Sequence, residues 1–127
     1  MSTLLKSIAR ARKEYCKTKP GSEEQRIAFE NWSKLSFEEI KGAATVSEAY
    51  AAYIHAPFRG DALDAARDKW NELSLKEAEE ADTIEKAEAA RMSAPNGSEA
   101  KRVALEKTYQ LAVGVIERHL SNPQGVI

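Results

Sequence analysis

The chain has 127 residues and a formal net charge of −1, and 43% of its residues are hydrophobic and 31% charged. This balance is typical of one folded helical domain and argues against disorder, because apolar residues recur along the whole chain. A single cysteine excludes an internal disulfide, and no stretch approaches the roughly 18 apolar residues that a membrane helix needs. We therefore expect a cytoplasmic protein with no membrane segment.

Similar residues recur along the chain with a spacing of 38. The members of the repeat include Ala11, Ala49 and Ala87; Ala28, Ala66 and Ala104; Leu35, Leu73 and Leu111; and Trp32 and Trp70. A fixed period in this range is typical of architectures in which each unit stacks on its neighbour. We predict a single domain, residues 1–127, built from three units at roughly 7–44, 45–82 and 83–120.

Each unit opens with a hydroxyl residue that is placed to cap a helix, namely Ser7, Thr45 or Thr83. In the second unit, Thr45 and Glu48 have the spacing of a capping box. Apolar residues at helical spacing follow. The first helix of each unit is therefore expected to reach about residue 18, 55 or 93.

A turn with proline and glycine then separates the first helix from the second, around residues 19–22, 56–60 and 94–98. Ser22 and Ser98 are placed to cap the second helix in two of the units. The second helices carry apolar residues spaced i, i+4 and i+7. Their repeated alanines predict close approach of two backbones, and their tryptophans predict a core between helices.

The second helix has two alternative endings. Ser36 and Ser74 each precede a glutamate by three residues, which matches a capping box. A break at these serines, which we favour, would add a short third helix to units one and two, whereas a continuous helix would leave hairpins. The third unit lacks the pattern, so a longer and more apolar helix is expected there, ending near Asn122–Gly125.

These elements predict an all-α fold of three tandem units of about 38 residues. The units would be helical hairpins or three-helix units, stacked as a short α-solenoid or a compact bundle. The predicted architecture resembles the α-solenoid class that includes tetratricopeptide and armadillo repeats. This resemblance implies an extended surface that binds other macromolecules.

Charge is distributed unevenly along the chain. Residues 1–20 hold six basic residues and one acidic residue, whereas residues 71–90 hold seven acidic and two basic residues. Four of the cations are spaced i, i+4, i+7 and i+11 and so share one face of the first helix: Lys6, Arg10, Lys13 and Lys17. This basic stripe is either an ordinary solvated face or a binding site for an acidic protein, nucleic acid or anionic lipid. The isoelectric point of about 6.2 disfavours nucleic acid.

Three aromatic side chains in the second unit complete the candidate partner-binding residues: Tyr50, Tyr53 and Phe58. Tyr50 and Phe58 have no aromatic counterpart 38 residues later, where Glu88 and Asn96 stand. Aromatic residues that are specific to one unit are candidates for recognition, because aromatic side chains are enriched at interface hot spots.

Residues that could carry catalytic or metal chemistry are few. His55 and His119 are expected at helix C-termini, where a cation suits the helix dipole, and Cys16 is expected to be a partly buried structural cysteine. The acidic run that includes Glu77 and Glu80 is interpreted as a solvated helix face. No catalytic, phosphate-binding or metal motif is present, so we expect no cofactor and no metal.

The favoured hypothesis is a non-enzymatic protein–protein interaction module whose partner is a protein or peptide, with an acidic partner as one form. One alternative is nucleic-acid binding through the basic stripe. The other is an enzyme or small-ligand protein with a pocket between helices. The sequence sets neither the partner nor the oligomeric state.

Overall fold

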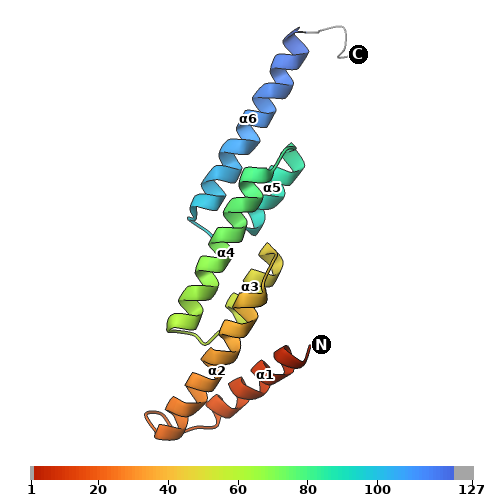
Figure 1. Cartoon of the computed structure of the whole chain (residues 1–127). Helices are drawn as coiled ribbons and strands as arrows, with labels where there is room; N and C mark the ends of the chain where they lie inside the picture. Colours follow the sequence, from red (N-terminus) through yellow and green to blue (C-terminus); the bar gives the residue numbers. More distant parts are fainter. Residues whose placement is uncertain (1, 122–127) are drawn as a thin grey trace. The chain divides into compact units, whose positions relative to one another are not determined.

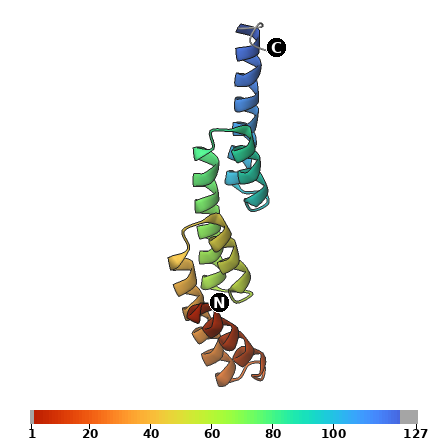
Figure 2. The same cartoon turned by 90° about the vertical axis from the view of Figure 1, so that its right-hand side faces the viewer.

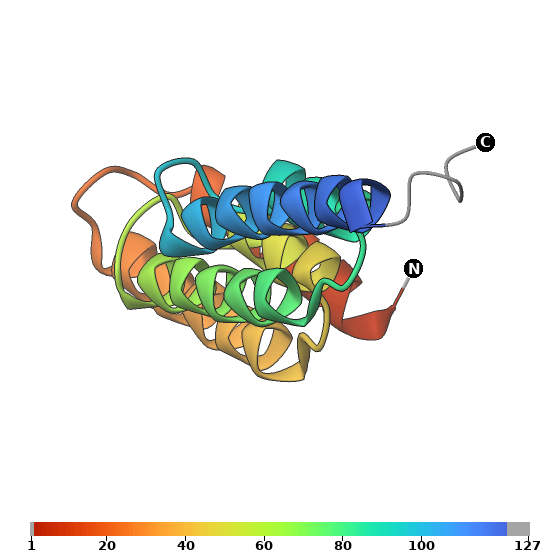
Figure 3. The same cartoon turned by 90° about the horizontal axis from the view of Figure 1, so that it is seen from above.

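The computed structural model describes residues 2–121, and every regular element in that range is an α-helix (Figure 1, Figure 2 and Figure 3). The helices are α1 (Thr3–Cys16), α2 (Glu23–Gly42), α3 (Val46–His55), α4 (Asp61–Glu80), α5 (Ile84–Ser93) and α6 (Glu99–Ser121). The all-α prediction is confirmed. The chain divides into two compact units, Met1–Trp70 and Asn71–Ile127, and the boundary falls within α4.

Unit 1 contains two small buried clusters. In the first, Ile8 and Ala11 of α1 pack against Trp32 of α2. In the second, Ile40 of α2 packs against Ala52 of α3 and Ala66 of α4. Because apolar residues at helical spacing bury one face of each helix, α1 is held on α2 and its opposite face is left for solvent.

Unit 2 has one buried cluster, formed by Ala78 of α4, Ala90 of α5 and Ala104 of α6. Helices α5 and α6 lie side by side in Figure 1 and Figure 2. Alanine has no side chain beyond Cβ, so helices that meet through alanines can approach closely. The sequence expectation of close approach at the repeated alanines agrees with Ala66 and Ala104, which are both fully buried, but not with Ala28, which is only half-buried.

Helix starts follow the predicted capping chemistry, with one correction. The side chains of Thr45, Thr83 and Ser22 accept hydrogen bonds from backbone N–H groups in the first turns of their helices, and the Thr45 and Glu48 capping box is present. Ser7 is not a cap. Helix α1 begins at Thr3 because Ser2 Oγ accepts from Leu5 N at 3.1 Å, which places Ser7 inside the helix.

Ser98 also caps as predicted, because its Oγ accepts from Lys101 N at 3.1 Å. The glycines of the three turns take the left-handed conformation that their positions suggested, with φ of 76° at Gly21, 98° at Gly60 and 73° at Gly97. At Gly60 an added Cβ would also lie 3.3 Å from the Phe29 ring, so a side chain there would be strained by the backbone conformation and would crowd that ring.

The favoured break at Ser36 and Ser74 is wrong. Helices α2 and α4 each run for 20 residues through these serines without interruption. Both side chains are buried, and neither hydroxyl has a hydrogen-bond partner. A capping side chain binds backbone N–H groups that have no partner within the helix, and the middle of a continuous helix offers none. These serines therefore act as small buried side chains.

The length of α6 and the burial of the two tryptophans can also be compared with the sequence predictions. Helix α6 has 23 residues, so the prediction of a longer last helix is confirmed, whereas its expected end at Asn122–Gly125 lies outside the described residues. Trp32 is buried as expected. Trp70 is only half-buried, and its ring lies 4.9 Å from that of Tyr50 and 5.4 Å from that of Tyr53.

Candidate functional site

The candidate site lies along α1, beside the face that packs on α2. The packed face sets its position, because Ile8 and Ala11 contact Trp32, and Leu4, Leu5, Tyr15 and Leu35 add a partly buried margin. Two of these residues, Leu5 and Ile8, also line the site. Tyr15 holds the end of α1 in place, because its ring lies 5.6 Å from the Trp32 ring and 6.0 Å from the Phe29 ring. The exposed face of α1 is therefore carried by a well-packed helix.

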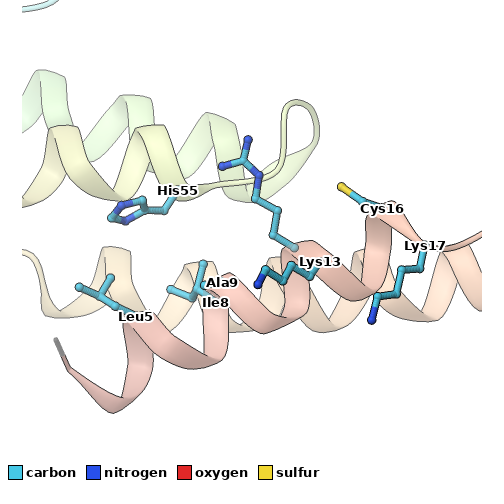
Figure 4. Close-up of a pocket in the computed structure, with 8 residues that line it drawn as sticks. Leu5, Ile8, Ala9, Lys13, Cys16, Lys17 and His55 are labelled. Atoms are coloured by element: carbon cyan, nitrogen blue, oxygen red, sulfur yellow. The ribbon is translucent and has the colours of Figure 1, made fainter.

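A pocket of about 500 Å³ lies along this face. Lys17, which directly follows α1, and His55, at the end of α3, line the pocket together with residues of α1 (Figure 4). The α1 residues are Leu5, Ile8, Ala9, Arg12, Lys13 and Cys16. The α1 positions follow i, i+3, i+4, i+7, i+8 and i+11, which places them on one side of the helix. The pocket thus combines an apolar floor with three cations.

His55 is anchored from two sides. Trp32 Nε1 donates to the His55 carbonyl oxygen at 2.9 Å, and His55 Nδ1 lies 2.8 Å from Glu39 Oε2. The second oxygen of this carboxylate, Glu39 Oε1, is buried without a partner. His55 is at a helix C-terminus as expected, but a specific carboxylate positions its ring beside the pocket.

The four residues of the basic stripe lie on the exposed side of α1, but only two of them line the pocket. Lys13 and Lys17 do so, whereas Lys6 and Arg10 are not among the lining residues. Lys17 is the C-cap residue of α1 and lies 3.6 Å from Glu14. Within residues 2–121, no carboxylate forms an ion pair with Lys6, Arg10 or Lys13, so their charge is not neutralised locally.

Arg12 is a lining residue that the sequence analysis did not select. Its guanidinium lies 5.9 Å from the centre of the Trp32 ring, a distance at which a cation and an aromatic face attract each other. A signal for it was available, because Leu5, Ala9, Arg12 and Cys16 repeat the i, i+4, i+7 and i+11 spacing of the basic stripe on the adjacent face. No spacing pattern in the sequence indicated that His55 would line the same pocket.

The three candidate aromatic residues do not form one site. Tyr50 and Tyr53 pack on Trp70, and Arg67 lies 5.7 Å from the Tyr53 ring centre. Phe58 instead lies 5.9 Å from Tyr15 and is 61% exposed. A hydrogen bond with the Tyr53 side chain raises the pKa of Arg67 above its ordinary value.

Arg59 adds a further cation on the same side as Phe58. Its guanidinium lies 5.6 Å from the Phe58 ring centre and 5.8 Å from the Phe29 ring centre. Phe58 thus packs between Tyr15 of α1 and the Arg59 side chain, close to the end of α1.

The expectation for Cys16 is wrong, because the cysteine is exposed at the end of α1. The apolar contacts of the last turn of α1 are made by Tyr15, so the next residue along points away from α2. His119 is exposed in the last turn of α6, and Glu77, Glu79, Glu80 and Asp82 are exposed as expected for a solvated face.

Two further properties concern the described residues as a whole. No group of three or more histidine, cysteine or acidic side chains within residues 2–121 could hold a metal ion. Among the same residues, no helix has the length and apolar character needed to span a bilayer.

No protein-family model matches the chain, and neither a curated protein nor a solved structure matches it.

Proposed function

We propose that the protein is a non-enzymatic protein–protein interaction module that binds an acidic, partly apolar segment of a partner through α1. The observation that carries this proposal is the combination of an apolar pocket floor with Arg12, Lys13 and Lys17. Apolar side chains of a partner would fill the floor, and carboxylates would meet the cations at the edge.

The pairing state of the cations supports an acidic partner. Lys6, Arg10 and Lys13 have no ion-pair partner within residues 2–121, so a partner carboxylate would not have to compete with one from the chain itself. Phe58 and Arg59 lie near the end of the same helix through Tyr15 and would extend the contact. Tyr50 and Tyr53 are engaged with Trp70 and would contribute only at a second surface.

The proposal includes the architecture that would carry this surface. The long helices α2, α4 and α6 begin at Glu23, Asp61 and Glu99, and these starts are 38 residues apart. This agreement with the sequence period supports three hairpin copies of one unit, stacked as a short α-solenoid or a compact bundle. A cytoplasmic location remains part of the proposal.

The direct test uses a synthetic probe. The probe is an acidic helical peptide with leucines at i, i+4 and i+7 and glutamates on both sides, and the comparison peptide has lysines in place of the glutamates. Fluorescence anisotropy at low salt should show micromolar binding of the acidic peptide only. The double variant Lys13→Glu/Lys17→Glu should weaken binding at least tenfold, because it reverses two charges at the pocket edge.

A matched control reverses two exposed lysines on other helices, Lys41→Glu and Lys76→Glu, and should leave binding unchanged. Absence of peptide binding up to millimolar concentrations would contradict the proposal. So would tighter retention of duplex DNA than of the peptide with a steep salt dependence, which would indicate a nucleic-acid-binding protein instead.

A further inference from the structure

Among the described residues that line the pocket along α1, named here the α1 pocket, His55 alone comes from another helix. Figure 4 shows its ring between the end of α3 and the part of α1 that carries Leu5 and Ile8. The α1 residues that line this part of the pocket are apolar, so His55 supplies a polar group where the floor has none. In apolar pockets a few well-placed polar groups fix the orientation of a ligand and provide specificity.

A mostly buried carboxylate holds the His55 ring. Nδ1 lies 2.8 Å from Glu39 Oε2, and the side chains of His55 and Glu39 are 36% and 13% exposed. An ionised carboxylate can only accept hydrogen bonds, so this contact places the ring hydrogen on Nδ1. Within residues 2–121, Nε2 of His55 has no hydrogen-bond partner. Nε2 is therefore the ring atom that is available to take up a proton or to bind a ligand.

The pair of Glu39 and His55 is specific to unit 1. Glu39 Oε1 is buried without a partner, and a carboxylate that leaves water loses hydration that one hydrogen bond does not restore. At the positions 38 residues later stand Glu77 and Ser93, and Glu77 is exposed. The glutamate is thus withdrawn from water at the position where the chain also has a histidine, and that histidine lines the α1 pocket.

The charged groups around His55 come from three helices and from the turn that follows α3. They are Arg12, Lys13 and Lys17 at the α1 pocket, Glu39 on α2, Glu48 in the cap of α3, and Arg59 in the turn. The Cys16 thiol is a further titratable group that lines the pocket. Cations outnumber carboxylates in this set. An anionic ligand in the pocket would offset the cations and so favour a positive charge on the His55 ring.

We propose that His55 couples binding in the α1 pocket to a proton. When an acidic segment binds, Nε2 takes up one proton from solvent and donates a hydrogen bond to a carboxylate of the segment. Glu39 accepts from Nδ1 on the other side of the ring, so the charged imidazole lies between two carboxylates. This inference rests on the proposed function of α1 and adds a dependence on pH to that site.

The direction of the pH dependence follows from linkage. Binding that takes up a proton becomes tighter as the pH falls, and imidazole is the side chain that ordinarily changes charge between about pH 5 and 8. Glutamates of the ligand stay ionised down to about pH 6. The affinity for an acidic segment should therefore increase between about pH 8 and 6 through His55 alone.

The first experiment measures affinity against pH by fluorescence anisotropy, with the acidic helical peptide of leucines and glutamates described above. Wild-type binding should be about fivefold or more tighter near pH 6 than near pH 8. His55→Asn keeps an N–H donor for Glu39 but has no group that titrates in this range, so its affinity should stay nearly constant. The matched control is His119→Asn, which removes the only other histidine of the sequence and should keep the wild-type dependence. Cys16→Ser should also keep it.

The outcomes separate this inference from the proposed function. Equal affinity near pH 6 and pH 8, or a pH dependence that persists in His55→Asn, would overturn the role of His55 and leave the proposed function intact. Absence of binding at every pH would contradict both. Circular dichroism of each variant checks that the helices are intact.

The second experiment needs no ligand and examines the ring itself. The ¹⁵N chemical shifts of the His55 ring distinguish the tautomer with hydrogen on Nδ1 from the tautomer with hydrogen on Nε2, and His55→Asn assigns the signals. Near about pH 9, where imidazole is neutral, the Nδ1–H tautomer should dominate in wild type and decrease in Glu39→Ala. A dominant Nε2–H tautomer in wild type would overturn the proposal, because Nε2 would then have no lone pair for a proton.

Discussion

The two units of the chain are built from the same kind of helix but have different cores. Unit 1 buries Ile8, Trp32, Ile40 and Val46 and packs the Tyr15 ring against Trp32. In the described part of unit 2 the buried residues are alanines, apart from Ser74 and Pro95. The difference shows that helices of one chain can pack either through large interlocking side chains or through close contact of small ones.

The two units should differ in local stability because their cores bury different amounts of apolar surface. Large aromatic and branched side chains remove more apolar surface from water than alanines do, at about 25 cal/mol per Å². Where Trp32 and Trp70 stand in unit 1, unit 2 has Thr108, whose hydroxyl donates to the Ala104 carbonyl oxygen at 3.0 Å. We therefore expect unit 2 to have the lower local stability, with faster amide hydrogen exchange in α5 than in α1.

The largest expected effect is that of Trp32→Ala. This change removes a buried indole and leaves the His55 carbonyl oxygen without its 2.9 Å donor. Loss of a buried aromatic side chain costs about 3–5 kcal/mol in the free energy of unfolding. Urea denaturation followed by circular dichroism measures it.

The counterpart in unit 2 is Thr108→Ala, which should cost less than about 1 kcal/mol because it removes a single hydroxyl and its local hydrogen bond. A loss at Thr108 equal to that at Trp32 would mean that the two cores are equally important. Such a result would contradict the comparison.

The next effect tests how closely the alanines of unit 2 are packed. Ala104→Leu adds three carbons to a side chain that is completely buried between α4 and α5. Overpacking of this kind costs about 1–3 kcal/mol, because neighbouring backbones must move apart. Ala89→Leu, at an exposed position of α5, is the control and should change the stability little. Stabilisation by Ala104→Leu would show a loosely packed core.

A smaller effect of opposite sign is expected at the buried serines. The hydroxyl groups of Ser36 and Ser74 have no hydrogen-bond partner, so replacing either serine with alanine removes an unsatisfied polar group. Each change should stabilise the chain by about 1 kcal/mol. The control Asn31→Ala, at an exposed position of α2, gains helix propensity alone. If the control stabilises as much as Ser36→Ala and Ser74→Ala, the hydroxyl groups carry no penalty.

These serines also show where the sequence was informative. Ser22 and Ser36 are each followed three residues later by a side chain that suits a capping box, Gln25 and Glu39, yet only Ser22 caps a helix. Gly21, with its positive φ, separates Ser22 from the preceding helix, whereas Ser36 follows residues that continue a helix. Capping chemistry is local, so it was predictable where a glycine also marked the turn, and the flanking residues could have corrected the prediction at Ser36.

The candidate site was predictable only in part, for a related reason. The shared face of Lys13 and Lys17 follows from helix geometry within one element. The pocket also needs His55, which is placed by Trp32 and by Glu39, and both of these lie on α2. Contacts between separate elements leave no spacing pattern in the sequence, so the pocket required the structure.

The smallest effect concerns pH and the start of α3. The backbone N–H of Ala44 and the hydroxyl of Thr45 donate to the Glu48 carboxylate and hold its pKa below the usual value. A lowered pKa in the folded state means that the stabilisation is complete above the unfolded pKa, about 4.3, and is lost as pH falls through the folded value. Glu48→Gln should therefore flatten the loss of stability between pH 5 and the onset of acid unfolding.

The corresponding position in unit 2 is Lys86, whose ammonium pairs with Asp82 at 2.9 Å, so α5 has a Thr83 cap without a glutamate. Glu85→Gln, in the first turn of α5, is therefore the control and should leave the pH profile of α3 unchanged. Amide exchange of residues 46–49, measured by NMR as pH is lowered, reports the helix start directly. If lowering the pH increases amide exchange in this segment equally in Glu48→Gln and in wild type, the carboxylate does not stabilise the start of α3. The two units would then not differ in this respect.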